Sequence, residues 1–244
     1  MSEGRKRVEW HMEIKLVRLN KYVSNSGLCT RREADDYIIN GRVSVNNEIV
    51  IKLGSKVSLD DEVKVDGKII FPYDFQYLLL NKPLDFDFNI SGKKNVLNLL
   101  SSLNAVNLTP TQITVKQFSG LVLISNDNDF NNSISKKFGS FKQLFEIKLR
   151  DIISNEDLNS IKNSSDSNNI EIISINYVNG GLKNELGLEV RASRMSSIVN
   201  LFEKYNHKVI SIDRVIIAGL SKKDLPRGKW RLLKKQEVVN LNSF

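Results

Sequence analysis

Apolar residues near the start of the chain recur every three or four positions, the period of a helix, as far as Gly27. Gly27 and Gly41 are both suited to end a helix in a left-handed cap. A second helix is expected to begin at Thr30, because Thr30 and Glu33 form the pattern of a capping box. The sequence therefore predicts two short helices between Leu16 and Gly41.

Two alternating segments follow these helices, and each is divided by residues typical of tight turns. RVSV-NN-EIV turns at Asn46-Asn47, and EVKV-DG-KII turns at Asp66-Gly67. The non-periodic stretch FPYDFQ comes next and carries one of only four prolines. We therefore expect a tail at residues 1–15, a small domain at residues 16–70 and a linker at residues 71–76.

Beyond the linker, apolar strands dominate and two helical patterns interrupt them. The helical patterns are VLNLL at residues 96–100 and an amphipathic repeat from Met195 to Tyr205. A hairpin is expected around Asn179-Gly180. The expected strands are YLLLNKP at 77–83, which runs into a Lys82-Pro83 turn, SGLVLISND at 119–127 after a Ser119-Gly120 turn, FEIKL at 145–149, and VISIDRVIIAGL at 209–220, a strand that ends in a turn. These elements predict a second domain at residues 77–240 and an α+β chain.

The charge, the cysteine and histidine counts and the length of the apolar runs limit the classes of protein to which the chain can belong. The chain has 244 residues and a formal net charge of +8, which favours a polyanionic partner. Cys29 is the only cysteine, so no internal disulfide forms, and with two distant histidines a zinc site is not expected. No apolar run approaches the roughly 20 residues of a membrane span, and no secretory signal is visible. We expect a cytoplasmic protein without a metal site.

Two arginines in the first turn of the second helix are unusual. Arg31 and Arg32 lie where the helix carries partial positive charge, so each costs roughly 0.3–1 kcal/mol. One reading is that both side chains are solvated and screened. The reading we favour is that the guanidinium groups, the free amides and the helix dipole together form a phosphate site.

The stretch RLNKYVSNSGLCTRREADDYIINGRVSVNN resembles the alpha-L RNA-binding domain, a module shared with a small-subunit ribosomal protein and several RNA-modifying enzymes. In that family two helices lie against structured RNA. The resemblance implies a phosphate-facing set of Arg18, Lys21, Arg31, Arg32 and Arg42.

The order of elements along the rest of the chain resembles the ribosomal RNA pseudouridine synthases of the RsuA/RluB type. The resemblance is carried by YLLLNKP, VLNLL, PTQITVKQFSGLVLISND and NHKVISIDRVIIAGLSKKDLPRGKWRLL. It implies a central, mostly antiparallel sheet with flanking helices and a cofactor-free isomerisation of uridine. It also implies a monomer that binds ribosomal RNA, with Lys82 and Arg194 as further RNA contacts.

The catalytic positions of that family are changed in this chain. The family motif reads approximately GRLDxxTSGLLLLTNDG, and its essential aspartate falls on Val115. Its tyrosine falls on Phe145, which keeps a stacking face without the hydroxyl. In the third motif, similar to EGRNRQVRRM, only Arg194 keeps a basic side chain, and Val199 stands where an arginine is expected. Covalent catalysis needs a nucleophile, and valine offers none.

Three hypotheses follow from this combination. The first is an RNA-binding relative without chemistry that aids ribosome biogenesis. The second is an RNA-modifying isomerase that uses a displaced carboxylate. The candidates for that carboxylate are Asp85, Asp87, Asp127 and Asp129, and we expect Asp127 to be a structural cap. The third is an eroded gene product with little function.

Overall fold

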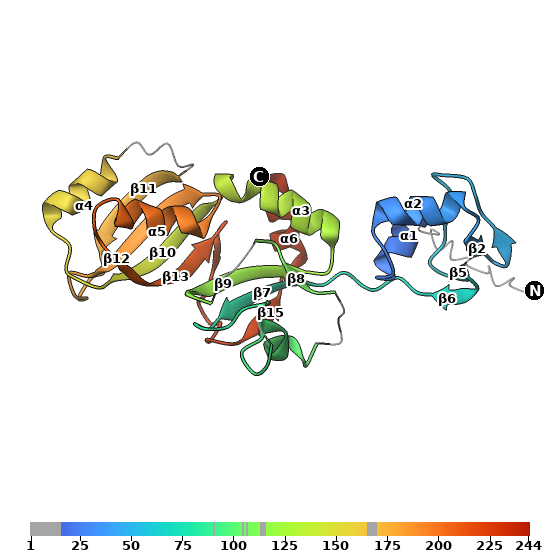
Figure 1. The fold of residues 1–244 in the computed structure, drawn as a ribbon, viewed down its shortest axis with the longest axis horizontal. Helices are drawn as coiled ribbons and strands as arrows, with labels where there is room; N and C mark the ends of the chain where they lie inside the picture. The colour runs from blue at the N-terminus through green and yellow to red at the C-terminus, as the bar shows by residue number, and fades with distance from the viewer. Residues whose placement is uncertain (1–15, 90, 104, 106, 113–115, 165–169) are drawn as a thin grey trace, which may run out of the picture. The chain divides into compact units, whose positions relative to one another are not determined.

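A computed structural model describes residues 16–244 except 90, 104, 106, 113–115 and 165–169 (Figure 1). The chain divides into two compact units between Asp74 and Phe75. This division lies inside the stretch at residues 71–76 that we expected to be a linker. Each unit is described separately below. The expected tail at residues 1–15 lies outside the described residues.

The first unit consists of two helices and short strands around its own core. The capping box at Thr30 is present, with the Glu33 amide donating to Thr30 Oγ1 and the Thr30 amide donating to a Glu33 carboxylate oxygen. Leu19, Tyr22 and Ile38 are buried in its core. Its elements are β1 (Val17–Arg18), α1 (Leu19–Asn25), α2 (Arg31–Ile39), β2 (Val43–Val45), β3 (Glu48–Ile49), β4 (Lys56–Val57), β5 (Val63–Val65) and β6 (Lys68–Ile70).

The two predicted hairpins of this unit are confirmed. Strands pair in the order β3-β2-β5-β6, and β1 pairs with β4. Asn46, Asn47, Asp66 and Gly67 all have positive φ, as the tight turns between these strands require.

The second unit is built on one nine-stranded sheet, which runs β11-β12-β10-β13-β9-β7-β15 with β14 and β8 at its side. Its strands are β7 (Tyr77–Lys82), β8 (Thr109–Pro110), β9 (Phe118–Ser125), β10 (Lys142–Leu149), β11 (Ile170–Tyr177), β12 (Glu185–Ala192), β13 (Val209–Ile217), β14 (Leu220–Ser221) and β15 (Trp230–Leu232). Among the described strands β13 and β9 pair in parallel, and the other pairs are antiparallel. The predicted fold class, α+β with a mostly antiparallel sheet, is confirmed.

Helices cover this sheet in two groups (Figure 1). The helical elements are η1 (Val96–Leu100), α3 (Asn128–Lys137), η2 (Phe138–Ser140), α4 (Asn155–Lys162), α5 (Met195–Glu203) and α6 (Lys235–Ser243). α4 and α5 pack on β10, β11, β12 and β13, whereas α3 and α6 pack near β7 and β9. The α6 helix was not predicted, because its sequence is mostly polar and charged.

The strands β7 and β9 are buried on both faces, which explains their uninterrupted apolar runs. Leu79, Leu121 and Leu123 pack toward α3 and α6. Leu80 and Val122, on the opposite face, pack in a separate cluster with η1. In β10, by contrast, alternate residues are exposed, because only one of its faces is covered.

Candidate functional site

Four neighbouring strands bring predicted positions into one row across the large sheet. Phe145 of β10 pairs with Arg214 of β13, Arg214 with Gly120 of β9, and Gly120 with Lys82 of β7. Phe145 and Lys82, which are 63 positions apart in the sequence (145 − 82), therefore lie at the same level of the sheet. The motif containing Ser119 and Gly120 lies between them.

The predicted turn at Ser119-Gly120 is wrong, because both residues lie inside β9. Gly120 has a φ of +93°, and a Cβ at this position would collide with the Arg214 backbone and with Asp213. Ser119 Oγ donates to the Ile212 carbonyl at 3.3 Å. The glycine therefore serves the close approach of β9 to β13 rather than a change of chain direction.

Arg214 is a buried cation at the centre of this row. Its side chain is 2 % exposed, and its NH2 group donates to Gln112 Oε1 at 2.7 Å. Within the described residues its Nε has no hydrogen-bond partner, and no carboxylate forms an ion pair with it. Burial lowers the pKa of Arg214 to about 9, which leaves it charged at neutral pH.

Gln112 connects this cation to a neighbouring turn. While its Oε1 accepts from Arg214, its Nε2 donates to the Ser193 carbonyl at 2.7 Å. In the sequence, Gln112 lies three positions before Val115. Val115 itself, the position expected to hold the family's aspartate, lies outside the described residues. Neither Gln112 nor Arg214 was predicted as a site residue.

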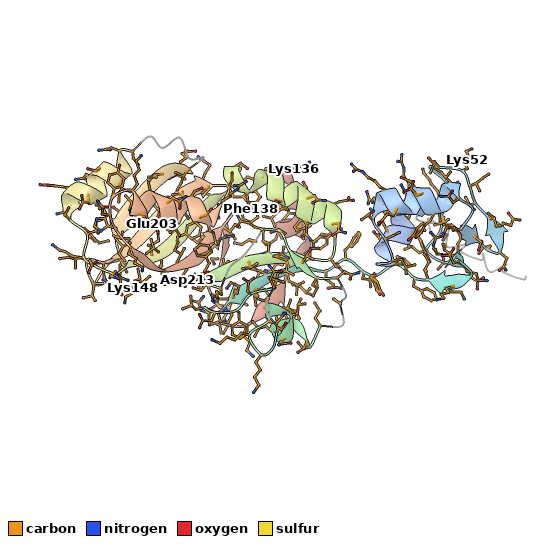
Figure 2. The ribbon with its side chains drawn as sticks, in the orientation of Figure 1. Lys52, Lys136, Phe138, Lys148, Glu203 and Asp213 are labelled. Atoms are coloured by element: carbon orange, nitrogen blue, oxygen red, sulfur yellow. The ribbon has the colours of Figure 1, made fainter. Side chains whose placement is uncertain are left out.

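Phe145 is 1 % exposed and belongs to the core under α5. The guanidinium carbon of Arg214 lies 5.6 Å from its ring centroid and 5.4 Å from that of Phe138. These distances are in the range of cation–π contacts. We call Gln112, Phe138, Phe145, Ser193 and Arg214 the arginine cluster; Phe138 is labelled in Figure 2. In this conformation the Phe145 ring faces protein, so its proposed role in stacking on a base stays a prediction.

Lys82 is also buried, with 1 % exposure. Its ammonium group donates to the Pro83 carbonyl at 3.2 Å and to the Phe86 carbonyl at 2.6 Å. Burial lowers the pKa of Lys82 to about 8, although Asp87 and Asp85 oppose the shift. A direct contact between Lys82 and RNA stays a prediction, and it would require the segment after β7 to open.

An ion-pair network lies beside the row, around Asp213. Arg227 binds the Asp213 carboxylate through two nitrogens, at 3.0 and 2.6 Å, and Lys222 approaches it at 2.8 Å. The side chain of Asp213, labelled in Figure 2, is 14 % exposed. Despite burial, these two cations lower the pKa of Asp213. Arg227 also donates to Asn81 Oδ1, which ties β7 to β13.

The carboxylates considered as substitutes for the missing aspartate have identifiable contacts. Asp127 is the N-cap of α3, as expected, and accepts from the amides of Asp129 and Phe130. Asp85 forms an ion pair with Lys94 at 3.0 Å. Its backbone amide donates to the Lys116 carbonyl at 2.8 Å, so Asp85 lies beside the segment that follows Val115.

The predicted phosphate-facing residues of the first unit lie mainly on its surface. Arg18 is the N-cap of α1, and both Arg18 and Arg32 are exposed; Lys21 and Arg31 are half-buried. Arg42 pairs with Asp66 through two nitrogens and lies 3.9 Å from the Tyr37 ring centroid. In the second unit, Arg194 is exposed at the N-cap of α5.

The described part of the chain contains neither a membrane-spanning helix nor a cluster of side chains suited to a metal ion. No helix there is long and apolar enough to cross a membrane. No group of three or more histidine, cysteine or acidic side chains is arranged to hold a metal ion in those residues.

Known proteins resemble both units. Residues 17–63 match the S4 domain. The dual-specificity RNA pseudouridine synthase RluF of Escherichia coli K12 is 28 % identical over 234 residues, covering 92 % of this chain and 78 % of RluF. The ribosomal large subunit pseudouridine synthase B of Bacillus subtilis 168 is 25 % identical over 237 residues, covering 94 % of this chain and 97 % of that protein.

A solved structure supports the fold. The crystal structure of a pseudouridylate synthase superposes with a TM-score of 0.58 at 20 % identity, covering 92 % of this chain and 99 % of that one. The sequence matches extend over both units, and the S4 match at residues 17–63 lies within the small domain expected at residues 16–70. The chain is therefore a relative of the ribosomal RNA pseudouridine synthases, with an S4 domain in front of a pseudouridine synthase fold.

Proposed function

We propose that this chain is an RNA-binding member of the pseudouridine synthase family that docks on ribosomal RNA and has lost uridine isomerisation. It would act in the cytoplasm as a monomer and aid ribosome biogenesis. The RNA assignment is supported by the S4 domain, by the net charge of +8 and by relatives named as RNA and ribosomal large subunit pseudouridine synthases.

The loss of chemistry is supported mainly by the partner of Arg214. A buried guanidinium is expected to face a carboxylate, because an uncompensated buried charge costs roughly 3–5 kcal/mol. Among the described residues, the acceptor that meets Arg214 is the amide oxygen of Gln112. Ile113, Thr114 and Val115, which follow in the sequence, carry no carboxylate. A nucleophile of the family's kind is thus missing from the motif itself.

Mapping pseudouridine in ribosomal RNA from cells with and without this protein tests the proposal. We expect identical maps, together with a changed profile of ribosomal particles in the cells that lack the protein. Disappearance of a single pseudouridine would refute the loss of activity. An unchanged particle profile would instead favour the eroded gene product.

A second candidate function is an active isomerase with a displaced carboxylate, and the hydrogen bond from Asp85 to Lys116 favours it specifically. This contact places an acidic loop beside the segment after Val115. If this candidate were correct, Asp85→Asn would abolish product formation, whereas Asp127→Asn would mainly weaken the cap of α3. We expect no product from the unaltered chain.

A further inference from the structure

The amide of Gln112 has a different partner at each end. Its oxygen accepts from Arg214 and its nitrogen donates to the Ser193 carbonyl, both at 2.7 Å. The side-chain amide meets both demands at once, because it has an oxygen to accept from the guanidinium and a nitrogen to donate to the carbonyl. A glutamate here would keep the first contact, as an ion pair, and would lose the second.

The Ser193 carbonyl belongs to the turn between β12 and α5, and that turn is held at further points. Gln143 Nε2 donates to the neighbouring Ala192 carbonyl at 2.9 Å. Gly139 approaches so closely that an added Cβ would lie 2.5 Å from Ser193 Oγ. Gln112 adds the hydrogen bond that links this turn to the buried cation of β13.

Arg194 directly follows Ser193 and is exposed at the N-cap of α5. Holding the Ser193 carbonyl therefore also constrains the backbone from which the Arg194 side chain projects. A long cationic side chain loses less conformational freedom on binding a phosphate when its backbone is already fixed.

We infer that Gln112 is a positioning residue that couples the buried Arg214 to the Ser193–Arg194 turn and so presents Arg194 to a phosphate of the bound RNA. This inference rests on the proposed RNA-binding function. It goes beyond that function by giving Gln112 a role of its own. Gln112 aligns with the glycine that opens the family motif, three positions before the aspartate, and a glycine has no side chain to perform this role.

Gln112→Glu separates this role from a purely structural one. The carboxylate preserves a partner for Arg214, so the midpoint of denaturant unfolding should not fall below that of the unaltered chain. The Ser193 contact is lost, so affinity for an in vitro transcribed large-subunit ribosomal RNA should fall three- to tenfold. Gln112→Met, which removes both contacts, should lower the unfolding midpoint and the affinity together.

A double-substitution cycle with Arg194→Gln completes the test. In the unaltered chain, Arg194→Gln should weaken binding five- to tenfold; in the Gln112→Glu background it should weaken binding less than twofold further. Full affinity of Gln112→Glu, or independent effects of the two substitutions, would overturn the role of Gln112. Failure of the unaltered chain to bind the transcript would sink the proposed function as well, so the two failures are distinguishable.

Discussion

Arg214 and Lys82 lie in the same row of the sheet, and both buried cations are bonded to neutral oxygens. Arg214 donates to the amide oxygen of Gln112, and Lys82 donates to the carbonyls of Pro83 and Phe86. Neutral acceptors compensate a buried charge less well than a carboxylate does. Burial lowers the pKa of both side chains.

Lys82 makes the stability of the second unit depend on pH. Its folded-state pKa of about 8 lies below its ordinary value of 10.5, so above pH 8 the unfolded chain binds more protons than the folded one. Stability from this group therefore rises between pH 8 and 10.5. When the pH is raised from 7 to 10, we expect the unfolding free energy of the unaltered chain to rise by about 1–3 kcal/mol more than that of Lys82→Met. Urea titrations at both pH values measure these free energies, and a difference between the two chains that does not change with pH would contradict the prediction.

Restoring the nucleophile alone should not restore catalysis. We expect Val115→Asp combined with Phe145→Tyr to form no pseudouridine on a ribosomal RNA transcript. The third motif keeps a basic side chain only at Arg194, and Val199 stands where the family has an arginine, so the new carboxylate alone does not rebuild the site. Mass spectrometry of the treated transcript checks this, and product from the double variant would show that the other catalytic groups are intact.

The close approach of β9 to β13 depends on Gly120. A Cβ at Gly120 would meet the backbone of Arg214, and the residue also has positive φ. We expect Gly120→Ala to lower the unfolding free energy by about 3–5 kcal/mol. Gly180→Ala is the matched control, because Gly180 also has positive φ but no atom near its added Cβ. Gly180→Ala should lower the unfolding free energy by only about 1–2 kcal/mol. Similar losses in both variants would argue against a close approach of β9 to β13 at Gly120.

Elements with local signals could be predicted from the sequence. The capping box at Thr30 and the turns at Asn46 and Asp66 are encoded by a few adjacent residues, so they were predicted correctly. Gly120 looked like a turn residue because its constraint comes from β13, which is distant in sequence.

The site itself was less predictable. Arg214 offered one signal, an arginine inside the otherwise apolar run of VISIDRVII. Its partner Gln112 carried none, because their contact joins residues 102 positions apart. Phe145 was placed correctly in a strand, whereas Lys82 was expected in a turn and is the last residue of β7. The burial of both depends on packing from other elements.

RNA binding by the whole chain should be strongly salt-dependent. The logarithm of affinity should fall by roughly 0.7–0.9 per tenfold salt for each phosphate contacted. Arg32→Ala should weaken binding and reduce that slope by about 1. Lys52→Ala is the control, because Lys52 is also an exposed cation of the first unit but is not in the predicted set (Figure 2). Equal effects of both substitutions would indicate nonspecific attraction.

The most direct measurement incubates the purified chain with unmodified ribosomal RNA transcripts and counts pseudouridine by mass spectrometry. Ribosomal large subunit pseudouridine synthase B of Bacillus subtilis serves as the positive control. We predict that the chain binds the transcript and leaves every uridine unchanged, even at protein concentrations above that of the RNA. A stoichiometric or greater yield of pseudouridine at one position would contradict the loss of isomerisation.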